Sequence, residues 1–217
     1  MDKRKIVKNV EKYVKAELSG DPTGHDWRHA WRVCRTAKAI AREEGGDLFV
    51  IELGALLHDI ADWKFAGGDE KAGSKKADDL LRKLGADEGT INKIKEIVDD
   101  VSFKGAGVEN KIRTKEGMIV QDADRLDVIG AIGIARVFAY GGSTCREIYN
   151  PDIKPKLHKT FEDYKKNKSS SINHFYEKVL LLKDRLNTKT ARKMAAKRHK
   201  FLEKYLEQFF EEWEGKA

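Results

Sequence analysis

The chain has few cysteines and no long apolar run, and both absences limit what it can be. Only two of its 217 residues are cysteines, Cys34 and Cys145, and neither has a second thiol near it in the sequence. A zinc site built from thiolates is therefore excluded, and the two thiols are typical of reduced, buried or incidental cysteines in a cytosolic protein. No stretch of 18 apolar residues occurs, so no segment is expected to span a membrane.

Three further patterns are missing. The basic N-terminus has no apolar stretch behind it, so no secretory signal is expected and a cytoplasmic location is predicted. The glycine-rich stretch 66–74 lacks the Lys-Ser/Thr pair that a phosphate-binding P-loop needs at a set spacing. No convincing strand pattern and no repeat with a period of 20–50 residues is present. The sequence therefore predicts an all-helical fold.

Charge is abundant and slightly unbalanced. The composition is 40% hydrophobic and 36% charged, and 43 Lys and Arg against 36 Asp and Glu give a net charge of +7. This balance favours anionic partners such as phosphate esters. A basic run at 183–204 is interpreted as a solvated helix face, because glutamates follow it and aromatic residues for base stacking are not interleaved. A nucleic-acid partner is therefore not expected.

Apolar residues recur every three to four positions along most of the chain, which predicts amphipathic helices. Glycine pairs at 45–46 and 141–142 are expected to end two of them. The segment 116–140 is apolar nearly all round, so it is expected to form one long, central and buried helix, with close helix contacts at Gly130 and Gly133. The expected helices are 6–18, 26–44, 47–59, 77–84, 91–101, 116–140, 158–164, 172–186 and 188–213.

Three segments combine histidine with aspartate. The first is His25-Asp26-Trp27-Arg28-His29, the second is Leu57-His58-Asp59-Ile60-Ala61-Asp62, and the third is Gln121-Asp122-Ala123-Asp124-Arg125-Leu126-Asp127. Imidazole nitrogens and carboxylate oxygens are both ligands for divalent metal ions. A single His-Asp pair arises often by chance, but three such segments on three expected helices favour a common metal site.

The order His, then His-Asp, then Asp resembles the signature of the HD superfamily of metal-dependent phosphohydrolases. The stretches around 101–105, 129–136 and 174–178 are similar to one bacterial subgroup of small HD hydrolases, so the resemblance covers about residues 10–213. It implies an all-α fold, an HD-domain helical bundle with additional C-terminal helices. The whole chain, 1–217, is expected to be one domain, with a metal-binding core at about 20–140 and a C-terminal helical extension at about 156–214.

The resemblance also implies the metal ligands, which are His29, His58, Asp59 and Asp124 in this sequence. The extra His pair of dinuclear HD relatives is missing before Asp124, so one divalent ion is expected. Mn is favoured among Mn, Fe, Co, Ni, Zn and Mg. Asp127 shares a helix face with Asp124 and is either a partner that orients the site or an ordinary helix salt bridge.

Several neighbouring residues are candidates for the chemistry. Asp62 occupies a position where some HD relatives have a catalytic carboxylate, which would orient or deprotonate the attacking water. Developing phosphoryl charge needs fixed cations, and Lys64, Lys104 and Arg125 are candidates for that role. His25 either contacts the substrate or fixes the start of its helix.

The function that the resemblance implies is hydrolysis of a small phosphate ester or anhydride. A nucleotide is the expected substrate, with a nucleoside triphosphate pyrophosphohydrolase as the first candidate. A 5′-nucleotidase-type phosphomonoesterase and a non-catalytic, nucleotide-sensing HD module remain the alternatives.

Overall fold

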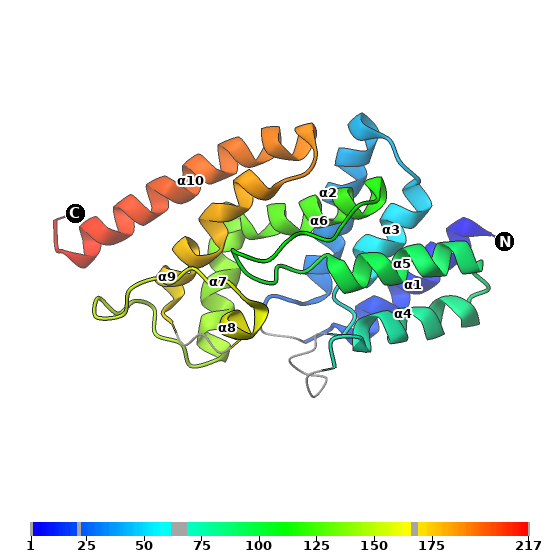
Figure 1. The fold of residues 1–217 in the computed structure, drawn as a ribbon, viewed down its shortest axis with the longest axis horizontal. Coiled ribbons are helices and arrows are strands. Elements are labelled where there is room, and N and C mark those ends of the chain that lie inside the picture. The colour runs from blue at the N-terminus through cyan, green and yellow to red at the C-terminus, as the bar shows by residue number, and fades with distance from the viewer. Residues whose placement is uncertain (1, 21–22, 62–68, 166–168, 217) are drawn as a thin grey trace. The chain divides into compact units, whose positions relative to one another are not determined.

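All regular elements in the described part of the chain are helices, which confirms the all-α prediction (Figure 1). The structure is a computed structural model, and it describes residues 2–20, 23–61, 69–165 and 169–216. The helices are α1 (Lys3–Glu17), α2 (Trp27–Glu44), α3 (Leu48–Leu57), α4 (Ala72–Lys83), α5 (Glu88–Asp100), α6 (Lys115–Val128), α7 (Ala131–Ser143), α8 (Phe161–Lys165), α9 (Ser171–Glu177), the 3-10 helix η1 (Val179–Arg185) and α10 (Lys189–Trp213).

The chain forms two compact units. Unit 1 comprises Met1–Phe103 and Glu109–Asp124, and unit 2 comprises Lys104–Val108 and Arg125–Ala217. Helix α6 belongs to unit 1 through Asp124 and to unit 2 from Arg125. The sequence-based division into a core at about 20–140 and an extension at about 156–214 stays a prediction.

Unit 1 is built around α3. This helix is apolar except for Glu52, and eight of its residues are buried, among them Leu53 and Leu57. It packs against α1, α2 and α5. Gly54 lets these helices approach closely, because a Cβ there would lie only 3.2 Å from Ile97 Cδ1 and 3.4 Å from Val120 Cγ2. The burial of most of α3 fixes where its C-terminal end, and the residues after it, can lie.

Aspartate caps set the starts of the helices that carry the site. The side chain of Asp26 accepts a hydrogen bond from the backbone N–H of His29, and that of Asp47 accepts one from Phe49. Each cap satisfies a donor that a helix N-terminus leaves without an intrahelical partner. Gly45 ends α2 with φ +80°, as the glycine pair predicted. His29 therefore lies in the first turn of α2.

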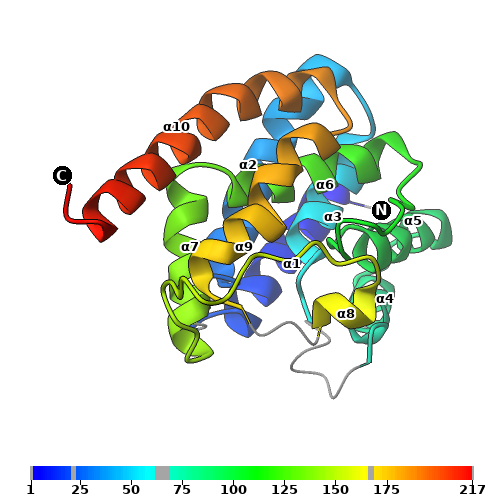
Figure 2. The same ribbon diagram turned by 60° about the vertical axis from the view of Figure 1, so that its left-hand side comes forward.

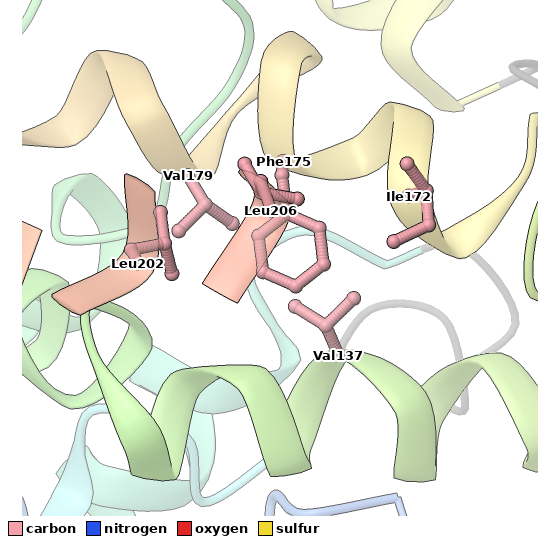
Figure 3. Close-up of a cluster of buried hydrophobic side chains, with 6 residues drawn as sticks. All are labelled: Val137, Ile172, Phe175, Val179, Leu202 and Leu206. Carbon is pink, nitrogen blue, oxygen red and sulfur yellow. The ribbon is translucent and has the colours of Figure 1, made fainter. Parts of the chain in front are cut away.

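Unit 2 has its own apolar core. Phe175 is fully buried and lies in the middle of the cluster, with Val137 of α7 beside it (Figure 3). The cluster draws side chains from α7, α9, η1 and α10, and these elements contact one another in pairs. Its six members are Val137, Ile172, Phe175, Val179, Leu202 and Leu206.

The single helix expected over 116–140 is wrong. The chain forms α6 and α7 instead, with a break at Ile129 and Gly130. Gly130 has φ +95°, which favours glycine, and a Cβ there would lie 3.1 Å from Cβ of Arg198 on α10. The close contact predicted at Gly130 is therefore confirmed, but complete burial is not, because Ile132 is 48% exposed. The apolar pattern continues across the break, so it did not indicate the change of chain direction that Gly130 permits between α6 and α7.

A second expected helix, 172–186, is also divided. It consists of α9 and the 3-10 helix η1, which meet at Lys178. Within the described ranges, no single helix has the length and apolar content to cross a membrane, although α6 and α7 taken together pass that test as a bent pair.

Candidate metal centre

Three helices bring four candidate ligands together in unit 1. His29 lies in the first turn of α2, His58 is the C-cap residue of α3 and Asp59 follows it. Asp124 comes from α6, beside the fully buried Ala123. The four residues span 95 positions of the sequence, from His29 to Asp124, yet all of them belong to one unit.

The ligand atoms converge closely. The Nε2 atoms of His29 and His58 lie 3.0 Å apart. Asp59 Oδ2 lies 3.3 Å from His29 Nε2 and 3.4 Å from His58 Nε2. Asp124 Oδ1 lies 3.5 Å and 3.8 Å from the same two nitrogens. The ligand atoms of His29, His58 and Asp59 all lie within 4.8 Å of one another, a spacing that could hold a metal ion.

The two imidazoles are held differently from the two carboxylates. His29 and His58 have side chains that are 0% and 1% exposed, whereas the side chains of Asp59 and Asp124 are each 22% exposed. His58 Nδ1 lies 2.8 Å from the carbonyl oxygen of Ala55. A neutral His58 that donates from Nδ1 presents the lone pair of Nε2 to the cluster, which is how metal-ligating histidines are usually oriented.

Electrostatics makes the cluster a site for a cation. Burial alone would lower the pKa of His58, but the negative charges of Asp59 and Asp124 outweigh burial and raise this pKa to about 9. Burial likewise works to raise the pKa of Asp59, but the His58 charge and hydrogen bonds from both histidines hold it well below its usual range. The partly exposed carboxylate of Asp59 thus stays ionised and is stabilised by a positive charge beside it.

The donor set suits a divalent metal ion. Two imidazole nitrogens and two carboxylate oxygens match ions from the Mn to Zn series, and carboxylates also suit Mg. The partial exposure of Asp59 and Asp124 leaves one side of the cluster in contact with solvent. The residues present therefore fit the metal ion that the HD resemblance implies.

His25 lies beside this cluster. Its ring is 6.0 Å from the ring of His29 in an edge-to-face arrangement, and its Nδ1 lies 3.1 Å from Thr23 Oγ1. Its charge also contributes to lowering the pKa of Asp59. These contacts place His25 next to the candidate ligands, and its role in substrate binding stays a prediction.

Two predicted phosphate-binding residues lie in unit 2. Arg125 is buried and donates a hydrogen bond to the carbonyl of Arg185. Arg185 in turn donates to the carbonyls of Gly105, at 3.4 Å, and Ala106. Lys104 begins this short loop and is half-buried. The contribution of Arg185 could not be predicted from sequence patterns, because the contact joins residues about 80 positions apart.

Asp127 also belongs to unit 2, where it is 6% exposed. It pairs with Arg136 of α7 at 3.2 Å. This contact is a helix-to-helix ion pair, and a role of Asp127 in orienting the metal centre stays a prediction. The two remaining candidates, Asp62 and Lys64, lie outside the described residues.

Gln121 is a supporting residue that the sequence analysis did not single out. It is 1% exposed, and its Nε2 donates to the carbonyls of Asp100 and Val101 at the end of α5. It also exchanges hydrogen bonds with the amide of Asn110 at 2.8 and 3.0 Å. Because Gln121 is one helical turn before Asp124, these bonds fix the rotation of α6 that directs Asp124 towards the histidines. Its polar character within an apolar stretch was the only available signal.

Comparison with known proteins agrees with this geometry. Residues 26–129 match the model of the HD domain. The uncharacterized protein YpgQ of Bacillus subtilis (strain 168) is 34% identical over 209 residues, which cover 96% of this chain and 94% of YpgQ. The chain belongs to the HD-domain family. The match spans the first turn of α2 to the end of α6 and includes all four candidate ligands.

Solved structures of similar proteins share the whole fold. A Lactobacillus plantarum protein is 34% identical, with a TM-score of 0.87 and coverage of 97% of this chain and 98% of its own. An HD-superfamily hydrolase from Bacillus thuringiensis is 41% identical, with a TM-score of 0.73 and 98% coverage of both chains. B. subtilis YpgQ in complex with ADP is 30% identical in structural alignment, with a TM-score of 0.74 and coverage of 97% and 100%.

Proposed function

We propose that this HD-domain protein is a metal-dependent phosphohydrolase that acts on nucleotides, with nucleoside triphosphates cleaved to a monophosphate and pyrophosphate. The observation that carries the proposal is the convergence of His29, His58 and Asp59 within 4.8 Å, with Asp124 beside them. We assign the four residues as ligands of one divalent ion, for which Mn is favoured. A bound divalent ion supplies Lewis-acid chemistry, since it polarises a phosphoryl oxygen and acidifies water.

The relatives support both the reaction class and the substrate class. One structural neighbour is a named HD-superfamily hydrolase, and YpgQ was solved with ADP. A nucleoside diphosphate shares its base, ribose and phosphates with the proposed substrates. An excess of cations over anions in this chain also favours a polyanionic ligand.

Other residues have proposed roles around the four ligands. Asp62 orients the attacking water or accepts its proton. Lys64, Lys104 and Arg125 balance the charge of the phosphates, and His25 contacts the substrate. Arg185 supports two of these residues: it accepts from Arg125 and binds the loop that Lys104 begins. Asp127 acts as a partner that orients a ligand or the water of the site.

The deciding experiment is product analysis across a nucleotide panel. Purified protein with added Mn²⁺ is incubated with nucleoside mono-, di- and triphosphates, and phosphate and pyrophosphate are measured separately. Pyrophosphate with a nucleoside monophosphate is the expected product pair. Phosphate released from monophosphates indicates a 5′-nucleotidase instead, and binding without turnover indicates a nucleotide sensor.

Two variants then test the assigned roles. Asp62→Asn is expected to lower kcat by roughly 10²–10⁴, the usual scale for a positioned acid or base, with metal content unchanged. Lys104→Ala is expected to raise KM instead, because its contact with a phosphate is much the same in the ground and transition states. A near-normal kcat in Asp62→Asn removes Asp62 from the mechanism, and Asp127 is then the first alternative to test.

A further inference from the structure

The C-terminal end of α6 is held by a residue from a distant part of the chain. Helix α6 ends at Val128, four residues after Asp124. The last carbonyl groups of an α-helix have no regular partner within the helix, and that of Leu126 is one of them. This carbonyl accepts from the backbone N–H of Ile129 at 3.3 Å. It also accepts from Nη1 of Arg198 at 2.5 Å, and Arg198 lies 72 positions later, on α10.

Arg198 packs tightly against the turn that follows this helix end. A Cβ at Gly130 would lie 3.1 Å from Cβ and 3.4 Å from Cγ of Arg198. The stem of the arginine therefore contacts the residue at which the chain passes from α6 to α7, while its guanidinium group reaches the last turn of α6. In both ribbon views α10 passes this turn as one uninterrupted helix (Figures 1 and 2). The half-buried arginine is thus fixed at both ends of its side chain.

This contact is a C-terminal cap supplied by another helix. Arginine side chains can bind the last carbonyls of a helix, and their charge interacts favourably with the helix dipole there. Helix ends fray when nothing holds them. Asp124 lies about one turn before the end of α6, so fraying would reach the backbone that carries its carboxylate. The cap on Leu126 is therefore expected to keep that turn helical.

We propose that Arg198 is a positioning residue of the metal centre, which holds the turn of α6 that presents Asp124 to the ion. The inference rests on the proposed function, in which Asp124 is a metal ligand. Arg198 acts through the backbone of α6, a helix that belongs to both units. Gln121 holds the same helix one turn before Asp124, through the carbonyl of Val101 at 3.2 Å. Asp124 thus lies between two points at which α6 is fixed.

Arg192 provides a matched control on α10. Its Nε donates to the carbonyl of Leu186 at 3.0 Å, and its Nη2 donates to that of Asn187 at 3.3 Å. Leu186 is the C-cap residue of η1, and none of the four candidate ligands lies on η1. Arg192 and Arg198 therefore make the same kind of bond from the same helix. A purely structural role predicts similar behaviour of the two residues, whereas a positioning role predicts a difference in metal binding.

Mn²⁺ titration calorimetry of the full chain tests the proposal, and denaturant unfolding without metal measures the stability that each variant loses. Arg198→Met keeps the apolar stem beside Gly130 and removes the donors. It should weaken Mn²⁺ binding about tenfold, the lower end of the range for losing an outer partner of a metal ligand. Arg192→Met should leave the affinity unchanged. Arg198→Lys retains a cation and a donor, so it should bring the affinity back to within about threefold of the wild type.

A double-mutant cycle with Asp124→Ala separates positioning from general destabilisation. Asp124→Ala alone should weaken Mn²⁺ binding by more than about 100-fold. In that background Arg198→Met should have no further effect, because the ligand through which it acts is gone. If Arg198→Met does not fold, Arg198→Lys is compared with Arg192→Lys, and only the former should weaken binding.

The outcomes distinguish this inference from the proposed function. An unchanged affinity in Arg198→Met, with a large loss in Asp124→Ala, overturns the role of Arg198 and leaves the metal site intact. An equal loss from Arg198→Met in both backgrounds also overturns it, because the arginine would then support the fold as a whole. An Asp124→Ala variant that binds Mn²⁺ as tightly as the wild type overturns the assignment of Asp124, and the role of Arg198 with it.

Discussion

Both units bury polar side chains, but they use them differently. In unit 2, the side chain of Ser170 caps α9, Asn173 donates to the carbonyl of Ile153 at 2.6 Å, and Glu177 accepts from the backbone of Lys156 at 3.1 Å. These side chains form hydrogen bonds with backbone groups that have no partner within a helix. In unit 1, His29 and His58 direct their ring nitrogens at each other and at two carboxylates.

This difference distinguishes a structural polar cluster from a binding site. Buried polar groups that satisfy the backbone are stable as they stand. In unit 1, two imidazoles and two carboxylates contact one another rather than the backbone. Such a cluster contributes little to the stability of a fold, because burying charge is costly. The same arrangement becomes favourable when a divalent cation lies among the four groups. The polar cluster of unit 1 is therefore suited to binding a cation, whereas these buried polar side chains of unit 2 support its fold.

The largest expected effect tests the core of unit 2. Phe175→Ala should destabilise the protein by about 3–5 kcal/mol, because it removes a fully buried ring and leaves a cavity. Denaturant unfolding followed by circular dichroism measures the loss. Metal affinity of the folded protein should not change.

The neighbouring residue provides the control for this prediction. Tyr176 is 37% exposed, so Tyr176→Ala should cost much less than Phe175→Ala. Equal losses for the two variants would contradict the assignment of Phe175 to the centre of the core. A loss of metal affinity in Phe175→Ala would show that the two units are not energetically separate.

The second prediction tests the metal centre directly. His58→Ala should weaken Mn²⁺ binding by more than about 100-fold, since losing even an outer partner of a metal ligand costs 10–100-fold. Calorimetric titration and elemental analysis measure the change, and circular dichroism checks that the helices remain. His199→Ala is the matched control, because His199 is also a buried histidine, 5% exposed, but lies in unit 2. Unchanged metal content in His58→Ala would refute the site.

Sequence reasoning succeeded where a local pattern sufficed. The four candidate ligands could be named because His29, His58-Asp59 and Asp124 stand in recognisable motifs on predictable helices. The structure brings those side chains together, and their role as metal ligands stays a prediction. The break at Gly130 could not be predicted, because it depends on the approach of Arg198, 68 positions later, as well as on the glycine. Arg185 was missed for the same reason. Its contact with the loop after Lys104 leaves no periodic signal in the sequence.

The third prediction concerns pH. In the metal-free protein the pKa of His58 is raised to about 9, so the stability that its charge contributes is fully present below its unfolded pKa of about 6.5 and is lost as the pH rises through 9. A metal ion must displace that proton. Apparent Mn²⁺ affinity should therefore increase about tenfold per pH unit up to about pH 9.

Calorimetry in buffers of different ionisation enthalpy measures this proton release. About one proton should leave for each ion bound near pH 8. The metal-free protein should at the same time unfold more easily at pH 9 than at pH 7, which is the opposite trend to metal affinity. A metal affinity that does not vary with pH would show that His58 is not the protonated group of the cluster.

The smallest expected effect separates helix stability from site geometry. Asp26 caps α2 by accepting a hydrogen bond from the backbone N–H of His29, at 3.0 Å. The residue held by this cap is therefore itself a candidate ligand. Asp87 caps α5 in the same way through Thr90, at 2.9 Å, but no candidate ligand lies in that helix turn. Either Asp→Ala substitution should cost about 1 kcal/mol of stability, the usual value of an N-cap.

Only one of these two substitutions should affect metal binding. Without its cap the first turn of α2 frays, and His29 must be ordered again when the ion binds, so Asp26→Ala should weaken Mn²⁺ affinity by about fivefold, corresponding to the 1 kcal/mol of the lost cap. Asp87→Ala should leave the affinity unchanged at equal cost in stability. Thermal unfolding and Mn²⁺ titration of the two variants, run side by side, measure both quantities. Equal affinities would mean that His29 is held by its packing in unit 1 alone, and that the coincidence of cap and ligand has no part in forming the site.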